Sequence, residues 1–336
     1  MKSLKEIYGF NNTKKITTEE LKNIILEEVK NISEDANPKD LDPNRFPPRL
    51  RAAGKDKEDA DKDAVGGKLD GDGSDDVISV SSWSGNVGSL KPSQNSMDLY
   101  KLCNFFIAAC KVPAGLPGIS GLFTQGPGGK IDCIISSDEY IMDGHHRWGA
   151  LCMYDPSTSV GPDIQLAFPA LELIAVLNTI TVHITGRSGG KEGKTPLATA
   201  FSENAIRGQI KKFMDNPSDC WAADKSEENL KKILQNFSGS DKDLGDELLD
   251  AVMNKISSNL SSSNLTPVSD GSGMFDREDM PVLSPAAGHV MKAAKMLAAG
   301  EVDVNPPYAK GEEANESKKN SDNVIMENWR RLAGIL

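Results

Sequence analysis

The order of hydrophobic and polar positions predicts an alternation of strands and helices over residues 77–185. Short apolar runs bounded by Gly, Pro, Ser and Asp are typical of strands, and apolar residues at three- and four-residue spacing are typical of helices. We expect strands at 77–80, 131–135, 140–142, 164–168 and 181–185, and helices at about 97–110, 145–153 and 170–179. The strands at 131–135 and 140–142 flank a Ser-Ser-Asp turn, which favours a hairpin. Because strands and helices alternate, the sequence predicts a small α/β (α+β) domain.

Residues 186–308 show a different pattern, in which polar, helix-like segments are separated by runs of Ser, Asn and Asp. We expect helices there at about 196–214, 226–236, 241–259 and 286–299. The last of these would end at Gly300, since glycine tolerates a left-handed C-terminal cap. The prediction is a looser helical region that follows the α/β domain.

Both ends of the chain are predicted to carry a short amphipathic helix. Within residues 1–32, Thr17 and Glu20 form a capping box that precedes apolar residues at helical spacing. Residues 33–76 are rich in Asp, Lys, Pro and Gly, a composition typical of a disordered acidic linker. Residues 309–336 begin as a second polar linker and end in another amphipathic helix.

Composition and charge narrow the classes of partner. The net charge of −11 disfavours coating of duplex DNA, because affinity for phosphates depends on clustered Lys and Arg, although a local basic site stays compatible with it. The five cysteines are odd in number and include no Cys-x-x-Cys pair, which predicts reduced core thiols. No signal peptide and no run of the ~18 apolar residues needed for a spanning helix is found. We therefore expect a cytoplasmic protein without a membrane partner.

The sequence Asp-Gly-His-His-Arg-Trp at 143–148 carries the clearest chemistry, because it lies where a predicted strand turns into a predicted helix. It contains two of the four histidines of the chain. The amino end of a helix presents backbone N–H groups and positive dipole charge, and Gly144 lets the backbone approach an anion closely. Arg147 adds a planar donor that can bind two oxygens at once. This turn is predicted to bind phosphate.

On these residues the chain resembles the ParB/sulfiredoxin superfamily, whose nucleotide-binding members place a Gly-x-x-Arg turn at the same junction. The Asp-Gly-His-His-Arg form at 143–147 is most similar to the free-serine kinases of that superfamily and to related phage proteins. The segment Leu-Lys-Pro-Ser-Gln at 90–94 is similar to the one that follows the first strand in the superfamily and lines the site. The resemblance covers about a third of the chain, residues 77–185.

The resemblance implies a role for each matching position, with ATP or another nucleotide and Mg²⁺ as ligands. The residues expected to hold the phosphate oxygens are Gly144, His145, His146 and Arg147, and Ser93 and Gln94 are expected to line the same cofactor-binding site. Asp143 is expected to orient a histidine or a magnesium-bound water, and Trp148 to face inward or stack on the base. The candidate catalytic residues are Asp143, His145 and Asp98.

Two departures from the superfamily bear on the reaction. The serine kinases use a glutamate as general base where this chain has Gln94, and an amide cannot accept the proton, so Asp98 or Asp143 would have to substitute. The sulfiredoxins use a cysteine where this chain has His145, which disfavours reduction of sulfinic acids. A zinc site is also disfavoured, because no third ligand lies at metal spacing from His145 and His146.

Two functions of different classes remain open. The first is a nucleotide-binding protein of a tailed phage that transfers or hydrolyses a phosphate, as a kinase-like phosphotransferase or a nucleoside triphosphatase. The second is a non-catalytic virion or DNA-associated protein that docks on a phage structural or prohead assembly through residues 16–32 and 324–336, so that it is found in the host cytoplasm or on the virion. A ParB-like nuclease is less favoured, because no paired carboxylates of the two-metal type occur beyond the linker.

Overall fold

The computed structural model describes residues 76–117, 129–185, 195–267, 280–284 and 287–304. The predictions made for residues 1–32, for nearly all of 33–76 and for 309–336 lie outside the described residues. The described part has the mixed α/β composition that the sequence predicts. None of its helices is both long enough and apolar enough to cross a lipid bilayer.

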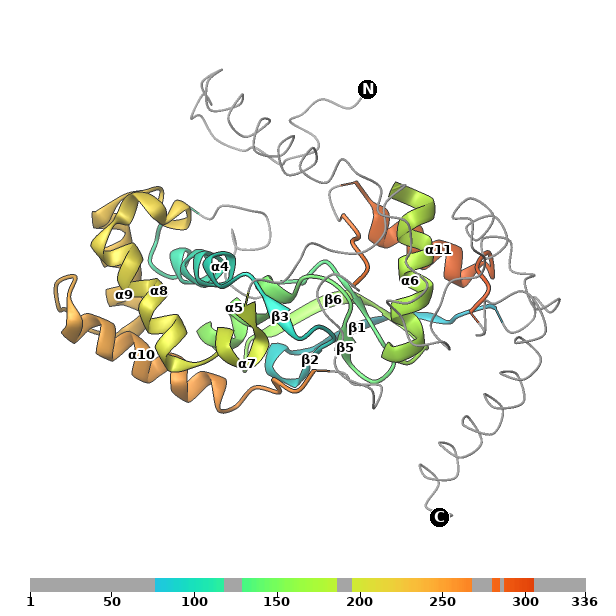
Figure 1. Cartoon of the computed structure of the whole chain (residues 1–336), viewed down its shortest axis with the longest axis horizontal. Coiled ribbons are helices and arrows are strands. Elements are labelled where there is room, and N and C mark those ends of the chain that lie inside the picture. Colours follow the sequence, from blue (N-terminus) through green and yellow to red (C-terminus); the bar gives the residue numbers. More distant parts are fainter. Residues whose placement is uncertain (1–75, 118–128, 186–194, 268–279, 285–286, 305–336) are drawn as a thin grey trace, which may run out of the picture. The chain divides into compact units, whose positions relative to one another are not determined.

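A five-stranded mixed sheet forms the centre of the described part (Figure 1). Its strands are β1 (Val80–Asn86), β2 (Lys91–Pro92), β4 (Ile134–Ile135), β5 (Tyr140–Ile141) and β6 (Ser159–Leu166). They lie in the order β1-β6-β4-β5-β2. The pairs β1–β6 and β4–β5 are antiparallel, and the pairs β4–β6 and β2–β5 are parallel. The hairpin predicted around residues 136–138 is therefore confirmed as the β4–β5 pair.

The two faces of this sheet belong to two separate hydrophobic clusters. Ile135 and Ile141 point into one cluster, whereas Ile134 and Met142 point into the other. Neighbouring residues of a strand face opposite sides, so this assignment follows from the period of two. The centre of the sheet is therefore covered on both faces, which explains why both residues of β4 are apolar and buried.

The first cluster is covered by helices from the middle and the later part of the chain. These are α4 (Leu99–Lys111), α5 (His145–Tyr154), α7 (Leu197–Ala200), α8 (Glu203–Asp215), α9 (Glu227–Ser238) and α10 (Asp246–Leu260). Two short 3-10 turns, η3 (Pro217–Asp219) and η4 (Trp221–Ala223), connect α8 to α9, and a third, η2 (Val87–Ser89), lies between β1 and β2. The buried residues of α8, α9 and α10 share one cluster with those of α4 and α5. The helices expected in 186–260 therefore extend this core and do not form a separate one.

The second cluster is covered by α6 (Ala170–Thr185) and α11 (His289–Ala298). The predicted strand at 181–185 is wrong, because these residues are the last turns of α6. Thr181 donates its hydroxyl hydrogen to the carbonyl of Leu177 at 2.7 Å, a side-chain bond that a helix allows a buried threonine. Leu177 and Ile180 are fully buried in the cluster, so packing outweighs the β-propensity of the apolar, β-branched run.

Three further differences concern strands. The strand predicted at 164–168 is β6, which begins at Ser159 and ends at Leu166. The first strand, predicted at 77–80, begins only at Val80 and runs to Asn86. A separate two-stranded ladder joins β3 (Ser96–Met97) to β7 (Thr195–Pro196) in antiparallel register. This ladder brings the chain back from residue 195 to the segment directly before α4, next to the predicted phosphate-binding turn.

Candidate functional site

The turn between β5 and α5 has the strand-to-helix geometry that the sequence predicts. Gly144 is the N-cap residue of α5 and has φ +77°, in the left-handed region that favours glycine. A Cβ at this position would lie 2.6 Å from Cγ2 of Ile131 and 3.1 Å from its carbonyl oxygen. Conformation and contact thus both require glycine, and the chain at 131 forms the wall against which the turn packs.

The two charged residues of the turn lie at its start and in the first helical turn. The Asp143 carboxylate accepts the Gly144 N–H at 2.6 Å, which fixes the peptide that enters α5. The Arg147 side chain retains 19 % exposure, and its Nη1 atom lies 3.6 Å from Oδ2 of Asp132. The guanidinium therefore reaches the surface at the amino end of the helix, where the dipole also favours an anion.

Both histidines of the turn hold the segment before α4. The Nε2 atom of His145 accepts the backbone N–H of Ser93 at 3.0 Å, and the Nε2 atom of His146 accepts the N–H of Asp98 at 3.0 Å. A ring nitrogen that accepts a hydrogen bond is unprotonated, so a neutral imidazole in each case carries its proton on Nδ1. The structure thereby brings the two segments singled out in the sequence, 90–98 and 143–148, into direct contact.

The contacts of Ser93, Gln94 and Asp98 give these residues structural tasks. Ser93 is fully buried, and its hydroxyl donates to the carbonyl of Ile141. Gln94 is 4 % exposed and donates its amide to the carbonyl of Ser96 at 2.7 Å. Asp98 is the N-cap of α4 and accepts the N–H of Lys101 at 3.0 Å. All three side chains therefore bond to the backbone and hold the segment that lies beside the turn.

Trp148 faces the interior, which is one of the two orientations expected for it. Its side chain is fully buried and packs edge-to-face on Phe201, with ring centroids 5.8 Å apart. The adjacent Gly149 lies against Leu102, Phe201 and Met97, where a Cβ would come within 2.9 Å of the first two. Stacking of Trp148 on a base is therefore incompatible with this packing.

Two aspartates that the sequence analysis did not single out lie beside the turn, in or bonded to the segment at 131–133 that packs against it. Asp163, at 4 % exposure, accepts the backbone N–H groups of Ile131, Asp132 and Cys133 at 3.0, 2.9 and 3.4 Å. Burial raises the pKa of the Asp163 carboxyl, and these hydrogen bonds act in the opposite direction. Asp132 has φ +56°, unusual for a residue with a side chain. The only sequence signal for this pair is the Asp within Gly-Pro-Asp at 161–163, far from the turn.

The thiols are uncharged at neutral pH, including that of Cys133, whose pKa is raised by burial and which interacts with Asp143 and Arg147 of the turn. All five cysteines are buried and unpaired, as predicted. Burial raises the pKa of Cys152 to about 12 and that of Cys220 to about 11, so these side chains are protonated at neutral pH. Among the described residues no group of three or more His, Cys, Asp or Glu side chains could hold a metal ion.

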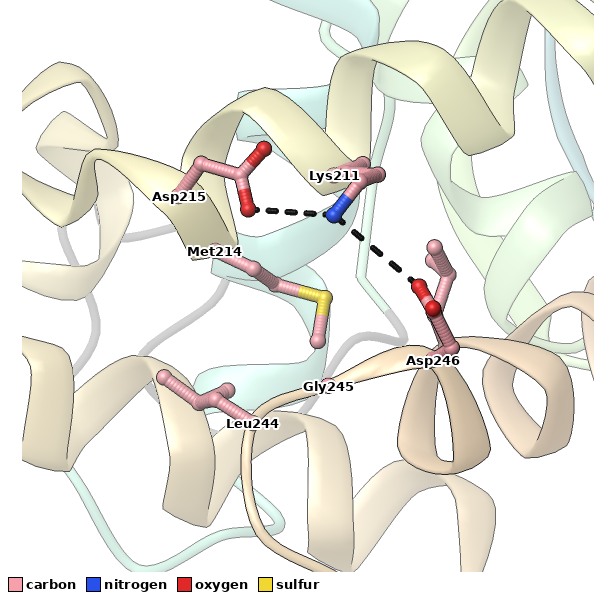
Figure 2. Close-up of a pocket in the computed structure, with 7 residues that line it drawn as sticks. Lys211, Met214, Asp215, Leu244, Gly245 and Asp246 are labelled. Atoms are coloured by element: carbon pink, nitrogen blue, oxygen red, sulfur yellow. Dashed lines mark hydrogen bonds and ion pairs between the residues drawn. The ribbon is translucent and has the colours of Figure 1, made fainter.

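A hollow elsewhere in the described part, between α8 and the start of α10, does not suit a nucleotide (Figure 2). Its cavity volume is about 50 Å³, against roughly 300–1,000 Å³ for a small-molecule site. Lys211 points between two carboxylates, 3.1 Å from Asp215 and 3.9 Å from Asp246. Its charge is already compensated there, so the turn at 143–147 remains the stronger candidate.

No protein-family model matches the chain, and neither a curated protein nor a solved structure matches it.

Proposed function

We propose that the turn at residues 143–147 binds the phosphates of a nucleotide. The observation that carries this proposal is the combination of Gly144 in a left-handed N-cap with Arg147 in the first turn of the same helix. Gly144 contributes no capping side chain, and the carboxylate at this end of the helix is that of Asp143, which accepts the Gly144 N–H. A backbone entry of this kind beside a guanidinium suits an oxyanion with several oxygens.

A nucleotide is preferred over other phosphates because of the resemblance to the ParB/sulfiredoxin superfamily at 90–94 and 143–147. The contacts of His145 and His146 support that resemblance, since they join the two segments that carry it. In this proposal Arg147 and the amino end of α5 hold the phosphates. The two histidines act through the backbone of Ser93 and Asp98, which they keep against the turn.

Magnesium fits the proposed site only as a partner of the nucleotide. A protein-bound Mg²⁺ commonly takes one or two carboxylates together with phosphate oxygens and water. Asp143 supplies such a carboxylate at the turn, and the described residues offer no complete cage around it. The metal would add charge neutralisation at the phosphates, while Asp143 would orient it.

The second candidate function is a binding module without turnover, and the contacts of the expected catalytic residues favour it over a phosphotransferase. Asp98 caps α4, and His145 accepts a buried backbone N–H. Gln94 cannot act as a base. Asp143 is then the remaining candidate for a catalytic carboxylate. In this alternative the protein is a phage virion or DNA-associated component, and its end segments 16–32 and 324–336 dock on a larger assembly.

Calorimetric titration of the full-length protein with ATP, ADP, CTP and GTP, each with and without Mg²⁺, tests the proposal. We expect binding of at least one triphosphate, with weaker binding of ADP than of ATP if the terminal phosphate is held at the turn. If none of the four nucleotides gives a binding heat, with or without Mg²⁺, the proposed function is contradicted.

Turnover is tested separately, by following the loss of the bound triphosphate over hours with Mg²⁺ and hydroxyl acceptors that include serine. If transfer occurs, Asp143→Asn should lower kcat far more than it weakens binding, because a carboxylate that orients the metal acts mainly in the transition state. Stable triphosphate in the presence of tight binding would select the binding module.

A further inference from the structure

The partly exposed guanidinium of Arg147 has a carboxylate, that of Asp132, beside it. Oδ2 of Asp132 is 3.6 Å from Nη1 of Arg147, and Oδ1 of the same side chain is 3.2 Å from Nζ of Lys130. The Asp132 side chain is 28 % exposed and the Arg147 side chain 19 % exposed. An anion that approaches the amino end of α5 therefore meets Asp132 at the guanidinium it would bind.

The position of Asp132 is set by the backbone and not by its ion pairs. Its φ of +56° is held by the buried carboxylate of Asp163, which accepts the N–H of Asp132 at 2.9 Å and that of Ile131 at 3.0 Å. The same stretch places Ile131 against Gly144. A conformation that costs free energy and is fixed by surrounding contacts is common at functional sites.

We propose that Asp132 competes with the ligand phosphate for Arg147 and thereby lowers the affinity of the turn for anions. This inference rests on the proposed function. A phosphate that reaches the amino end of α5 has to displace the Asp132 carboxylate from Arg147 and remains close to its negative charge. Lys130, which is 60 % exposed, stays paired with Asp132 when Arg147 turns to the ligand, so the displaced carboxylate keeps a cationic neighbour.

The test is titration of inorganic triphosphate, which carries no base, into the full-length protein and its Asp132→Asn variant, with and without Mg²⁺. Asparagine is isosteric and tolerates a positive φ, so the backbone is expected to keep its path. Loss of the competing carboxylate should tighten binding about fivefold, in line with the strength of partly exposed ion pairs. Asp241→Asn removes one charge at an exposed site between α9 and α10 and is expected to leave the affinity unchanged.

Asp132→Gly provides a second variant, because glycine adopts a positive φ without strain, and it should tighten binding to a similar extent. Unchanged or weaker binding by both variants, while the unmodified protein binds triphosphate, would overturn the inference and leave the proposed function standing. Weakening that appears only with Mg²⁺ would make Asp132 a metal ligand and would also overturn it. No binding by the unmodified protein or by either variant would overturn both proposals.

Discussion

At the scale of single residues, the turn between β5 and α5 depends on Gly144, because it requires both the left-handed conformation of this residue and its close contact with Ile131. We expect Gly144→Ala to lower the free energy of unfolding by about 1–3 kcal/mol, since the new Cβ adds both backbone strain and a clash. Phosphate binding should fall as well, because the amino end of α5 must shift. Urea unfolding and calorimetric titration of the variant measure the two effects.

Gly239→Ala is the matched control for that substitution. Gly239 has φ +70° as the C-cap of α9, but a Cβ there would meet nothing within 4 Å. Its replacement should cost about 1 kcal/mol from backbone strain alone and leave binding intact. Equal losses of stability in the two variants would show that the contact with Ile131 has no importance.

Asp163 leads to a prediction on pH. Burial raises the pKa of its carboxyl in the folded protein, so folded Asp163 holds its proton to higher pH than unfolded Asp163 does. Its contribution to stability is then fully present below the unfolded pKa and is lost as pH rises through the folded pKa. The free energy of unfolding of the unmodified protein should therefore exceed that of Asp163→Asn by more near pH ~3.5 than at pH ~7.

Urea unfolding of both proteins across this pH range measures that difference. Apart from its pH dependence, Asp163→Asn should cost about 1–3 kcal/mol, because an amide cannot replace a carboxylate that accepts three N–H groups. A stability difference that grows toward neutral pH would mean that these hydrogen bonds outweigh burial and lower the pKa.

At the scale of elements, His145 and His146 attach the start of α5 to the segment that leads into α4. His146→Ala should make the Asp98 amide exchange its hydrogen about fivefold faster, because it loses an acceptor worth about 1 kcal/mol. Native-state hydrogen exchange gives this rate directly. His146→Gln retains an acceptor at a similar distance and should exchange more slowly than the alanine variant. Equal exchange in all three proteins would show that the histidine does not hold the segment.

The elements also show how far the sequence is informative. Helices with strong periodicity and good caps were predicted close to their actual bounds, as for α9, where the Ser226 side chain accepts the N–H of Asn229. The apolar run at 170–185 was divided wrongly, because a helix buried in one cluster and a buried strand show the same composition. The features that distinguish the helix from a strand here, burial of Thr181 and its bond to Leu177, are visible in the structure but not in the sequence.

The candidate site was predictable to the same extent. Gly144 and Arg147 stand at the positions that the strand-to-helix pattern indicates, and the contact of 143–148 with 90–98 agrees with the motif pair. Asp132 and Asp163 were not foreseen, because their roles depend on β6 lying beside β4. The sequence carries no local sign of that pairing.

At the scale of the whole molecule, the described residues pack into two clusters on opposite faces of one sheet. Deletion of residues 287–336 would remove α11 and with it Val290, Met296 and Leu297, all buried in the second cluster. Each large apolar side chain of this kind contributes about 1.5–3 kcal/mol, a substantial share of a typical total of 5–15 kcal/mol. We expect loss of cooperative thermal unfolding in this deletion.

Deletion of residues 1–70 serves as the comparison. Most of this segment is the predicted linker that begins at residue 33, and a linker of that composition contributes little to a core, so we expect an unchanged Tm and unchanged nucleotide binding. Calorimetric melting of both truncated proteins measures the Tm and the cooperativity of unfolding that these predictions concern. A large fall in Tm on removal of residues 1–70 would show that the predicted N-terminal helix docks on the domain.

The measurement that tests the central claim most directly is the affinity of Arg147→Ala for the nucleotide that binds the unmodified protein. Arg207→Ala is the matched control, because Arg207 is also ion-paired, with Asp250 at 2.7 Å, but lies on α8 away from the turn. We expect Arg147→Ala to weaken binding at least tenfold, since a charge-assisted phosphate contact contributes about 1.5–3 kcal/mol, and Arg207→Ala to bind normally. Unchanged affinity in a folded Arg147→Ala protein would contradict the assignment of the turn at 143–147 as the phosphate site.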